Sequence, residues 1–253
     1  MKERIIECLN QIESDRNIKI LLACETGSRA WGFPSPDSDY DIRMVYVHEP
    51  EWYLSLNERK DTIEMMLDDN NLDISGWDLR KSLRLLWKSN PPFLERIQSP
   101  ILYKYDKQFS KEVNSLADEF YSPIATLHHY LNIAKKSYEA VAENDTYKLK
   151  TFFYGLRTAL ACQWILEKSE IPPIEFQKIL DGIQLESNLK KKIEDLIQLK
   201  STRNESYFHS GEKDILTLMK ETIDRADQKR KDLSASQGDM KDLDHFFRKW
   251  LKK

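Results

Sequence analysis

One short segment near the N-terminus constrains this chain more than any other part of its sequence. An apolar run at 18–24 leads directly into a turn that contains Gly27 and Ser28. Two aspartates one residue apart, Asp39 and Asp41, then open a second apolar run. A glycine turn followed by paired carboxylates suits phosphate groups held together with a divalent metal ion. The segment therefore predicts a bound nucleoside triphosphate.

The alternation of side chains along a strand explains why this pattern fits a metal. Successive strand residues point to opposite faces, so Asp39, Asp41 and Arg43 are expected to share one face. Two adjacent carboxylates repel each other, whereas a bound Mg2+ or Mn2+ keeps both ionised. In the preceding turn, Gly27 allows a phosphate to approach the backbone, and Ser28 can donate hydrogen bonds to its oxygens. We therefore expect these residues to clamp a triphosphate.

A third carboxylate is available in the apolar-acid-apolar triplet at 72–74, which has the character of a strand. If that strand lies beside the one that carries Asp41, then Asp39, Asp41 and Asp73 can hold two ions about 3.5–4 Å apart. We predict that Asp39 and Asp41 bind both metals. Asp73 would complete the catalytic-metal site and help to deprotonate the acceptor. The acids at 68–69 remain alternatives to Asp73 because they are close in sequence.

Together these motifs resemble the signature of the polymerase-beta-type nucleotidyltransferase superfamily. Within it, the chain resembles the predicted bacterial and phage nucleotidyltransferases called RlaP, or RNA-ligase-associated. The matching motifs are Gly-Ser-Arg-Ala-Trp-Gly-Phe at 27–33, Ser-Asp-Tyr-Asp-Ile-Arg at 38–43, Asp-Ile-Ser-Gly-Trp-Asp-Leu-Arg-Lys at 73–81 and Asn-Pro-Pro-Phe-Leu-Glu at 90–95, with a weaker match at 154–164. The resemblance implies an N-terminal mixed-sheet catalytic domain followed by helices, and it leaves the acceptor substrate unassigned.

Simpler explanations exist for each motif. Acids near the sequence Ser-Pro-Asp-Ser at 35–38 are also typical of a turn in which side chains bond their own backbone. Gly27 and Gly32 could imitate the nucleotide fingerprints of other folds. However, the chain has no Gly-Lys-Ser/Thr phosphate loop, and it lacks the third glycine of the dinucleotide pattern. The combined spacing of strand, Gly-Ser turn and three acids favours the nucleotidyl-transfer hypothesis.

Local patterns divide the chain into two predicted domains. Residues 1–120 are expected to form a catalytic α+β domain with a mixed sheet, and residues 121–253 an all-helical domain that binds substrate or nucleotide. The expected elements of the first are a helix near 3–14, strands at 18–24, 40–47, 62–67 and around Asp73, a helix capped by Asp78 and ended by the prolines after Asn90, and an edge strand near 101–103. Those of the second are helices near 123–143, 146–168, 173–181, 186–208, 211–235 and 240–251.

One predicted helix supplies further candidates for nucleotide binding. Lys150, Tyr154 and Arg157 fall at helical spacing on one face. Cationic groups there would neutralise charge on the leaving pyrophosphate, and the aromatic ring could stack on a base. The same pattern also suits an ordinary exposed helix face with a core tyrosine. The predicted nucleotide-binding residues are Gly27, Ser28, Arg29, Ser38, Lys150, Tyr154 and Arg157.

A different motif points to a rival activity. Arg203 and His209, in the sequence Arg-Asn-Glu-Ser-Tyr-Phe-His, resemble the Arg-polar-x4-His pattern of HEPN ribonucleases, which are helical proteins. An arginine and a histidine on one side of a helix could cleave RNA by acid-base catalysis. Alternatively, both residues are structural and lie near a helix end. A third hypothesis is a module that binds NTP without turnover, as a sensor or partner domain.

Composition narrows the remaining choices. The chain has 253 residues, 32% of them charged, and no long apolar stretch, so we expect a soluble protein without a membrane span or signal peptide. Three cysteines without disulfide or metal spacing are typical of a reducing cytoplasm. A net charge of −3 argues against indiscriminate nucleic-acid binding. It leaves room for a local basic patch, for which 190–192 and 248–253 are the densest candidates.

The sequence thus predicts a nucleotidyltransferase that uses two Mg2+ or Mn2+ ions. It would move a nucleoside monophosphate from an NTP to a hydroxyl acceptor and release pyrophosphate. An RNA 3′ end is the leading acceptor because of the family resemblance, and a protein hydroxyl or a small molecule are the alternatives.

Overall fold

The structure, a computed structural model, describes residues 1–67, 71–235 and 238–252, so the acids at 68–69 lie outside it. The described residues form two compact units. The sheet unit contains the described parts of 1–27, 39–121 and 236–253, and the helical unit contains 28–38 and 122–235. These units differ from the two continuous domains that the sequence predicts. The segment 28–38 belongs to the helical unit, and the C-terminal helix belongs to the sheet unit.

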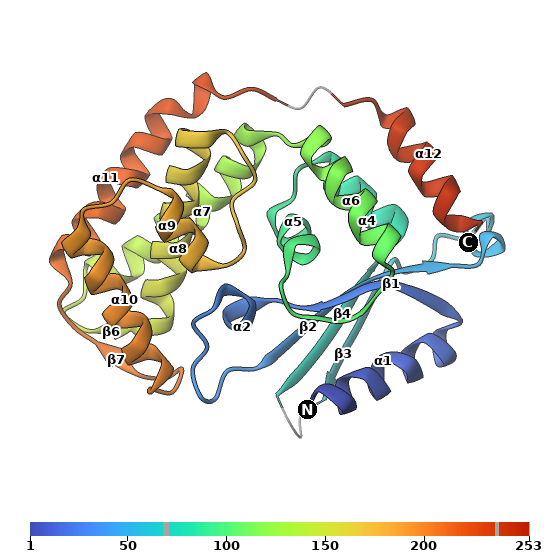
Figure 1. Cartoon of the computed structure of the whole chain (residues 1–253), viewed down its shortest axis with the longest axis horizontal. Helices are drawn as coiled ribbons and strands as arrows, with labels where there is room; N and C mark the ends of the chain where they lie inside the picture. The colour runs from blue at the N-terminus through green and yellow to red at the C-terminus, as the bar shows by residue number, and fades with distance from the viewer. Residues whose placement is uncertain (68–70, 236–237, 253) are drawn as a thin grey trace. The chain divides into compact units, whose positions relative to one another are not determined.

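A five-stranded sheet forms the centre of the sheet unit (Figure 1). The strand order is β3-β4-β2-β1-β5, with β2 and β4 parallel and the other neighbouring pairs antiparallel. The strands are β1 Ile18–Glu25, β2 Tyr40–His48, β3 Thr62–Leu67, β4 Leu72–Asp78 and β5 Leu102–Tyr105. A mixed sheet accompanied by many helices confirms the predicted α+β class.

Helices cover both faces of this sheet. Helix α1 packs an apolar stripe of Ile5, Leu9 and Ile12 against buried residues of β1, β2 and β4. Helices α4, α5 and α6 lie on the opposite face (Figure 1). The helices of this unit are α1 Lys2–Arg16, α3 Pro50–Tyr53, α4 Leu79–Trp87, α5 Pro91–Gln98, α6 Lys107–Phe120 and α12 Met240–Leu251. Because β1 and β2 are mostly buried between these layers, the side chains along them are held firmly.

Polar caps place the helices that follow β4. The Asp78 carboxylate accepts a hydrogen bond from the Arg80 backbone N–H at 2.8 Å, so α4 begins where the sequence predicts. Asn90 has a second role that the sequence pattern did not reveal. Its side chain accepts from the Phe93 N–H at 3.2 Å, and Pro91 occupies the start of α5. The same Asn-Pro-Pro motif therefore ends one helix and begins the next.

Helices α7, α8 and α11 pack together to form the core of the helical unit. A short antiparallel pair, β6 Tyr147–Lys148 and β7 Phe208–His209, accompanies them. Helix α2 is Gly27–Trp31, and its first residue is the last residue of the segment 1–27 of the sheet unit. The other elements of the helical unit are α7 Pro123–Ala142, α8 Leu149–Lys168, α9 Phe176–Gly182, α10 Ser187–Ser201, α11 Lys213–Lys229 and the short 3-10 helix η2 Arg230–Asp232. In the parts of the chain that the structure describes, no helix is both long and apolar enough to cross a bilayer.

Aromatic packing ties the segment 28–38 to the helical unit. Phe33 is buried, and its ring lies 5.0 Å from the ring of Phe153, between centroids. Lys200, also buried, donates hydrogen bonds to the Phe33 carbonyl at 3.0 Å and to Ser35 Oγ at 2.9 Å. Burial lowers the pKa of the Lys200 ammonium, and these two acceptors compensate for its lost hydration. The segment is therefore fixed by side chains that lie far from it in sequence.

The C-terminal helix α12 joins the sheet unit through Trp250. This side chain is 1% exposed, and its ring packs edge-on against Phe109 of α6 with a centroid distance of 5.1 Å. Its Nε1 donates to Glu112 at 3.2 Å, and Lys249 Nζ donates to the other oxygen of the same carboxylate at 2.6 Å. A helix that buries an aromatic anchor and satisfies its polar atom in this way stabilises the unit it covers.

Trp250→Ala is therefore expected to lower the free energy of unfolding of the sheet unit by about 3–5 kcal/mol, because it removes a buried aromatic side chain and leaves a cavity. Equilibrium urea unfolding of the full chain measures this change. Lys241→Ala, on the exposed face of the same helix, is the control and should change it by less than about 0.5 kcal/mol. A loss in Trp250→Ala as small as in the control would mean that α12 does not pack there.

Candidate functional site

The two strongest candidate acids lie side by side on neighbouring strands. Strands β2 and β4 run parallel with Asp41 opposite Asp73 in the register. One nitrogen of Arg43, Nη2, donates to Asp41 Oδ1 at 2.8 Å and to Asp73 Oδ2 at 2.7 Å. The Asp41 and Asp73 side chains are 31% and 34% exposed, so a ligand can reach both. The adjacency expected of the two carboxylates is confirmed, and the cation that bridges them is a guanidinium.

The glycine turn is fitted closely to Asp41. Gly27 has a φ of 63°, and a Cβ added to it would lie 2.2 Å from Asp41 Oδ2. Immediately before it, Thr26 donates to the Asp41 carbonyl from its backbone N–H at 2.9 Å and from Oγ1 at 3.2 Å. Glycine is required here for two reasons, since any side chain would both strain the backbone and collide with the carboxylate. Gly27 and the strand that carries Asp41 are thus packed directly against each other.

A buried carboxylate that was not predicted holds Asp41 from the other side. Glu25, at the end of β1, is fully buried, and its Oε1 accepts from the Asp41 backbone N–H at 2.6 Å. Its Oε2 accepts from the Tyr103 hydroxyl at 2.6 Å. In the sequence, a glutamate at the end of an apolar run indicates the position where a strand reaches solvent. Only its position directly before the glycine turn could have suggested a role in positioning.

Asp39 differs from the other two acids. It lies one residue before β2 begins, outside the strand ladder, and it is exposed. In the described part of the chain, no group of three or more His, Cys, Asp or Glu side chains is arranged to hold a metal ion. The carboxylates of Asp41 and Asp73 fit one shared cation. The arrangement of three acids around two ions therefore stays a prediction.

Within the helical unit, four of the predicted nucleotide-binding residues belong to one hydrogen-bond network. Ser28 Oγ donates to Ser38 Oγ at 3.0 Å, and Arg29 Nη2 donates to the Ser38 carbonyl at 2.7 Å. Ser38 Oγ in turn donates to Glu205 Oε1 at 2.9 Å. The other oxygen of Glu205 accepts from Lys150 Nζ. The hydroxyl and ammonium donors predicted for a triphosphate thus converge on a single carboxylate.

Glu205 is the second functional candidate that the sequence did not reveal. It lies in a turn after α10, where its backbone N–H donates to the Asp37 carboxylate at 2.9 Å. Burial alone would raise the pKa of Glu205, but hydrogen bonds from Lys150 and Ser38 hold it below its ordinary value. Glu205 is therefore an anion at neutral pH, with the same partners that a phosphate oxygen would need. No local pattern around it signals this contact, because Ser38 and Glu205 are far apart in sequence.

The helix face predicted at 150–157 is less uniform than expected. Arg157 is only 3% exposed, and its guanidinium lies 4.3 Å from the ring centroid of Trp31. Tyr154 is 37% exposed and packs edge-on against the same ring at 5.0 Å. Both residues therefore hold Trp31 in place. A direct contact of Tyr154 or Arg157 with nucleotide stays a prediction.

The helical placement expected for Arg203 and His209 is wrong. Helix α10 ends at Ser201, Arg203 lies in the following bend, and His209 belongs to β7. The Arg203 guanidinium lies 5.1 Å from the ring centroid of Tyr207. His209 Nε2 is 3.2 Å from Glu212 Oε1. The geometric basis for the ribonuclease hypothesis is therefore absent, because the turn at 202–207 breaks the helix that it requires.

Comparison with known proteins assigns a family. A model of the RlaP family, described as the RNA repair pathway DNA polymerase beta family, matches residues 1–249. The chain belongs to the RlaP family. This confirms the resemblance seen in the motifs, and membership in a polymerase beta family supports a nucleotidyltransferase-type role.

Two further similarities accompany the RlaP match. Uncharacterized protein YcgL from Bacillus subtilis (strain 168) is 42% identical over 241 residues, which are 95% of this chain and 92% of that protein. The crystal structure of a nucleotidyltransferase-like protein from Exiguobacterium sibiricum 255-15 aligns with a TM-score of 0.33 at 11% identity, covering 89% of this chain and 75% of that one.

Gly27→Ala tests how closely the turn is fitted to Asp41. The new methyl group requires a positive φ and occupies the position of the carboxylate, so we expect a loss of about 1–3 kcal/mol in the free energy of unfolding. Urea unfolding measures this loss. Gly32→Ala is the matched control, since Gly32 also has a positive φ but has open space around its Cα. Equal losses in both variants would show that backbone strain alone, without the Asp41 contact, governs the turn.

Proposed function

We propose that this chain is a metal-dependent nucleotidyltransferase that transfers a nucleoside monophosphate from an NTP to a hydroxyl acceptor. The observation that carries the proposal is the Asp41–Asp73 pair, held on parallel strands, bridged by one cation and braced by the Gly27 turn. Paired, partly exposed carboxylates beside a glycine turn are suited to binding a cation together with phosphate. The polymerase beta family to which the chain belongs supports the same class of reaction.

The carboxylate pair has suitable chemistry for Mg2+ or Mn2+. Asp41 and Asp73 would hold the ion, and Asp39 is proposed as a further ligand that allows a second ion. A divalent ion bound there would neutralise charge on the triphosphate and lower the pKa of the acceptor hydroxyl. For this to happen, the Arg43 guanidinium must release at least one of the carboxylates. Arg43 then serves as the counter-ion of the metal-free pair.

The phosphate donors are assigned to Ser28, Arg29, Ser38 and Lys150. In the helical unit, Ser38 and Lys150 donate to the Glu205 carboxylate, whereas Ser28 and Arg29 donate to Ser38. A triphosphate would replace that carboxylate as the acceptor of Ser38 and Lys150, so Lys150 would exchange one anionic partner for another at little cost in desolvation. Tyr154 and Arg157 would act through Trp31, whose ring they hold.

In the proposed reaction, the acceptor oxygen forms a bond to the α-phosphorus while the bond from that phosphorus to the bridging oxygen breaks. Asp73 takes the proton of the acceptor hydroxyl, and pyrophosphate leaves. Positioning and charge stabilisation supply most of the acceleration in this class of chemistry. The acceptor that we propose is an RNA 3′ hydroxyl, because the matching family is described as belonging to an RNA repair pathway.

The direct test is transfer of label from α-labelled NTPs in the presence of Mg2+ or Mn2+. RNA with a free 3′ hydroxyl should become labelled, and RNA with a blocked 3′ end should not. Asp41→Asn and Asp73→Asn should each reduce transfer at least about a hundredfold, the scale expected when a charge-stabilising group is lost from an active site. Asp15→Asn, an exposed acid of α1, is the control and should keep full activity.

Other outcomes of this experiment are equally informative. Label that appears on protein or on a small hydroxyl compound, and not on RNA, would replace the acceptor and keep the reaction. NTP binding without transfer to any acceptor class would favour the sensor module instead. Transfer that persists in both carboxylate variants would exclude Asp41 and Asp73 from catalysis.

A second test examines the metal without relying on activity. Arg43→Met should bind Mn2+ about fivefold more tightly than the unmodified chain, because the two ion pairs that it removes are together worth on the order of 1 kcal/mol. Titration calorimetry without nucleotide measures this change. Arg43→Lys keeps a cation and serves as the control, with affinity close to that of the unmodified chain. Weaker Mn2+ binding by Arg43→Met would contradict the idea that arginine and metal compete.

A further inference from the structure

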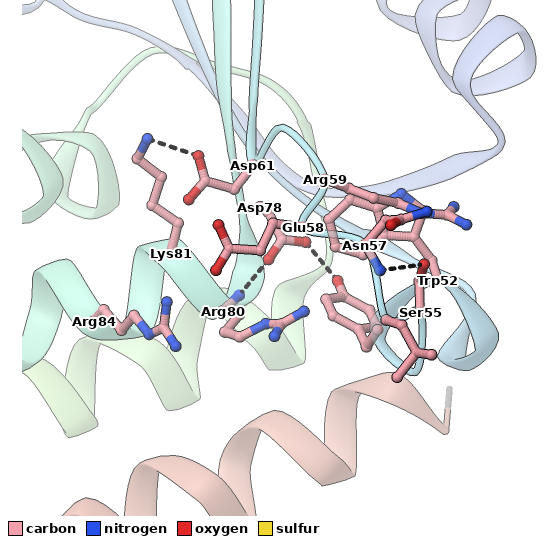
Figure 2. A pocket seen from close by; sticks show the side chains of 12 residues that line it. Trp52, Ser55, Asn57, Glu58, Arg59, Asp61, Asp78, Arg80, Lys81 and Arg84 are labelled. Atoms are coloured by element: carbon pink, nitrogen blue, oxygen red, sulfur yellow. Dashed lines mark hydrogen bonds and ion pairs between the residues drawn. The ribbon is translucent and has the colours of Figure 1, made fainter.

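The sheet unit contains a concave site away from the paired carboxylates. Its volume is about 250 Å3, and it is lined by α3, the segment 54–61 and the start of α4 (Figure 2). We refer to it as the α3–α4 pocket. It lies at the end of β4 marked by Asp78, whereas Asp73 lies near the beginning of that strand. At about 3.3 Å per residue, the strand length between them is roughly 16 Å.

Three arginines face this pocket without a carboxylate partner. Arg80 and Arg84 extend from α4, and Arg59 lies beside Trp52 on the other side (Figure 2). Among the residues that the structure describes, none of these three guanidinium groups forms an ion pair or a side-chain hydrogen bond. Arg59 instead lies 5.8 Å from the ring centroid of Trp52, and Arg80 lies 4.9 Å from that of Tyr53. The donors of all three groups therefore stay available to a ligand.

Two of the three acidic residues of the α3–α4 pocket are engaged with other residues of its wall. Asp61 accepts from Lys81 Nζ at 2.9 Å. Asp78 is buried and accepts from the Tyr53 hydroxyl and the Arg80 backbone N–H. Burial raises the pKa of the Asp78 carboxyl. Glu58 remains as an exposed carboxylate at the rim. Lys81 and Asp61 offset each other, and three arginines then face the carboxylates of Glu58 and Asp78, so the pocket keeps an excess of one positive charge.

Aromatic rings form the rest of the wall. Trp52 stacks face to face on His48, with centroids 4.0 Å apart and planes inclined by 5°. Burial, and then the neighbouring Arg59, lowers the pKa of His48 to about 4, so this stack is uncharged at neutral pH. Tyr53 packs edge-on against Phe247 of α12 at 5.1 Å. Both rings are thus held in place in the pocket wall, next to the guanidinium groups that lie over them.

We infer that the α3–α4 pocket binds a single-stranded nucleic acid, with Arg59, Arg80 and Arg84 on its phosphate oxygens and the Trp52 and Tyr53 rings against its bases. The planar guanidinium fork matches phosphate geometry better than an ammonium group does. Cationic side chains interleaved with stacking rings are the combination used by proteins that hold single strands. An acidic peptide would satisfy the arginines but would leave the rings without a stacking partner.

This inference needs only the sheet unit, but its connection to catalysis rests on the proposed function. If the chain extends RNA, the strand held in the α3–α4 pocket is the acceptor. At a rise of about 3.4 Å per nucleotide, a stacked strand covers the roughly 16 Å to Asp73 in about five nucleotides. The pocket would then hold the acceptor a few nucleotides from its reacting end.

Fluorescence anisotropy with labelled 12-nucleotide RNA and DNA of the same sequence tests the inference. Arg59→Glu and Arg84→Glu should each weaken binding about tenfold and reduce the dependence on salt concentration by about 0.7 in the log–log slope, the value for one lost phosphate contact on a single strand. Both residues are exposed, so these variants should fold normally. Arg4→Glu on α1 makes the same change of charge outside the pocket and should weaken binding less than twofold.

The RNA and DNA arms identify the type of strand, and a pocket-dependent loss in either supports the inference. Equal losses in Arg4→Glu and the pocket variants would mean diffuse attraction and would overturn it. Pocket-dependent binding of poly-glutamate in place of both nucleic acids would identify an acidic protein partner and overturn it as well. Asp41→Asn should bind RNA normally. A failure of nucleotidyl transfer with intact pocket-dependent binding would therefore refute the proposed function alone.

Discussion

The parallel pairing of β2 with β4 is the constraint on which the candidate site depends, because it sets Asp41 beside Asp73. Two carboxylates in this position repel each other, and Arg43 offsets the repulsion by donating to both. Glu25 holds the Asp41 backbone from β1, and Gly27 leaves the space that its side chain occupies. Asp41 is thus fixed from several sides, which preorganises its carboxylate for a cation.

In each of the two units, the candidate ligand-binding groups are neutralised by a side chain of opposite charge. In the sheet unit, a guanidinium neutralises the carboxylates that we assign to the metal. In the helical unit, the Glu205 carboxylate neutralises the Lys150 ammonium and accepts from the Ser38 hydroxyl, two donors that we assign to phosphate. Buried or half-buried groups of one charge are costly without a partner, so each set carries its own counter-ion.

The α3–α4 pocket shows how a chain with a net charge of −3 can still present a site for a polyanion. Dense runs of basic residues, such as 190–192 and 248–253, were the candidates visible in the sequence. The pocket is instead lined by Arg59 from the segment before β3 and by Arg80 and Arg84, four residues apart on α4. These arginines give the pocket its positive charge because, in the described part of the chain, no carboxylate forms an ion pair with them. Which charged residues form ion pairs cannot be read from composition.

The sequence by itself determined the strands, most of the helices, the acidic pair and the family, because apolar periodicity and a short Gly-Ser to Asp-x-Asp spacing are local signals. Asp41 and Asp73 lie side by side as expected, because the sequence around each residue has a clear strand pattern. Only the tertiary structure decided the roles of Glu25, Arg43 and Glu205. Each acts through a partner on another element, and a charged residue in one sequence gives no sign of which distant group it will neutralise. The helix expected through Arg203 and His209 failed for the same reason: the Glu205 turn between them is fixed by contacts with the segment 28–38, far away in sequence.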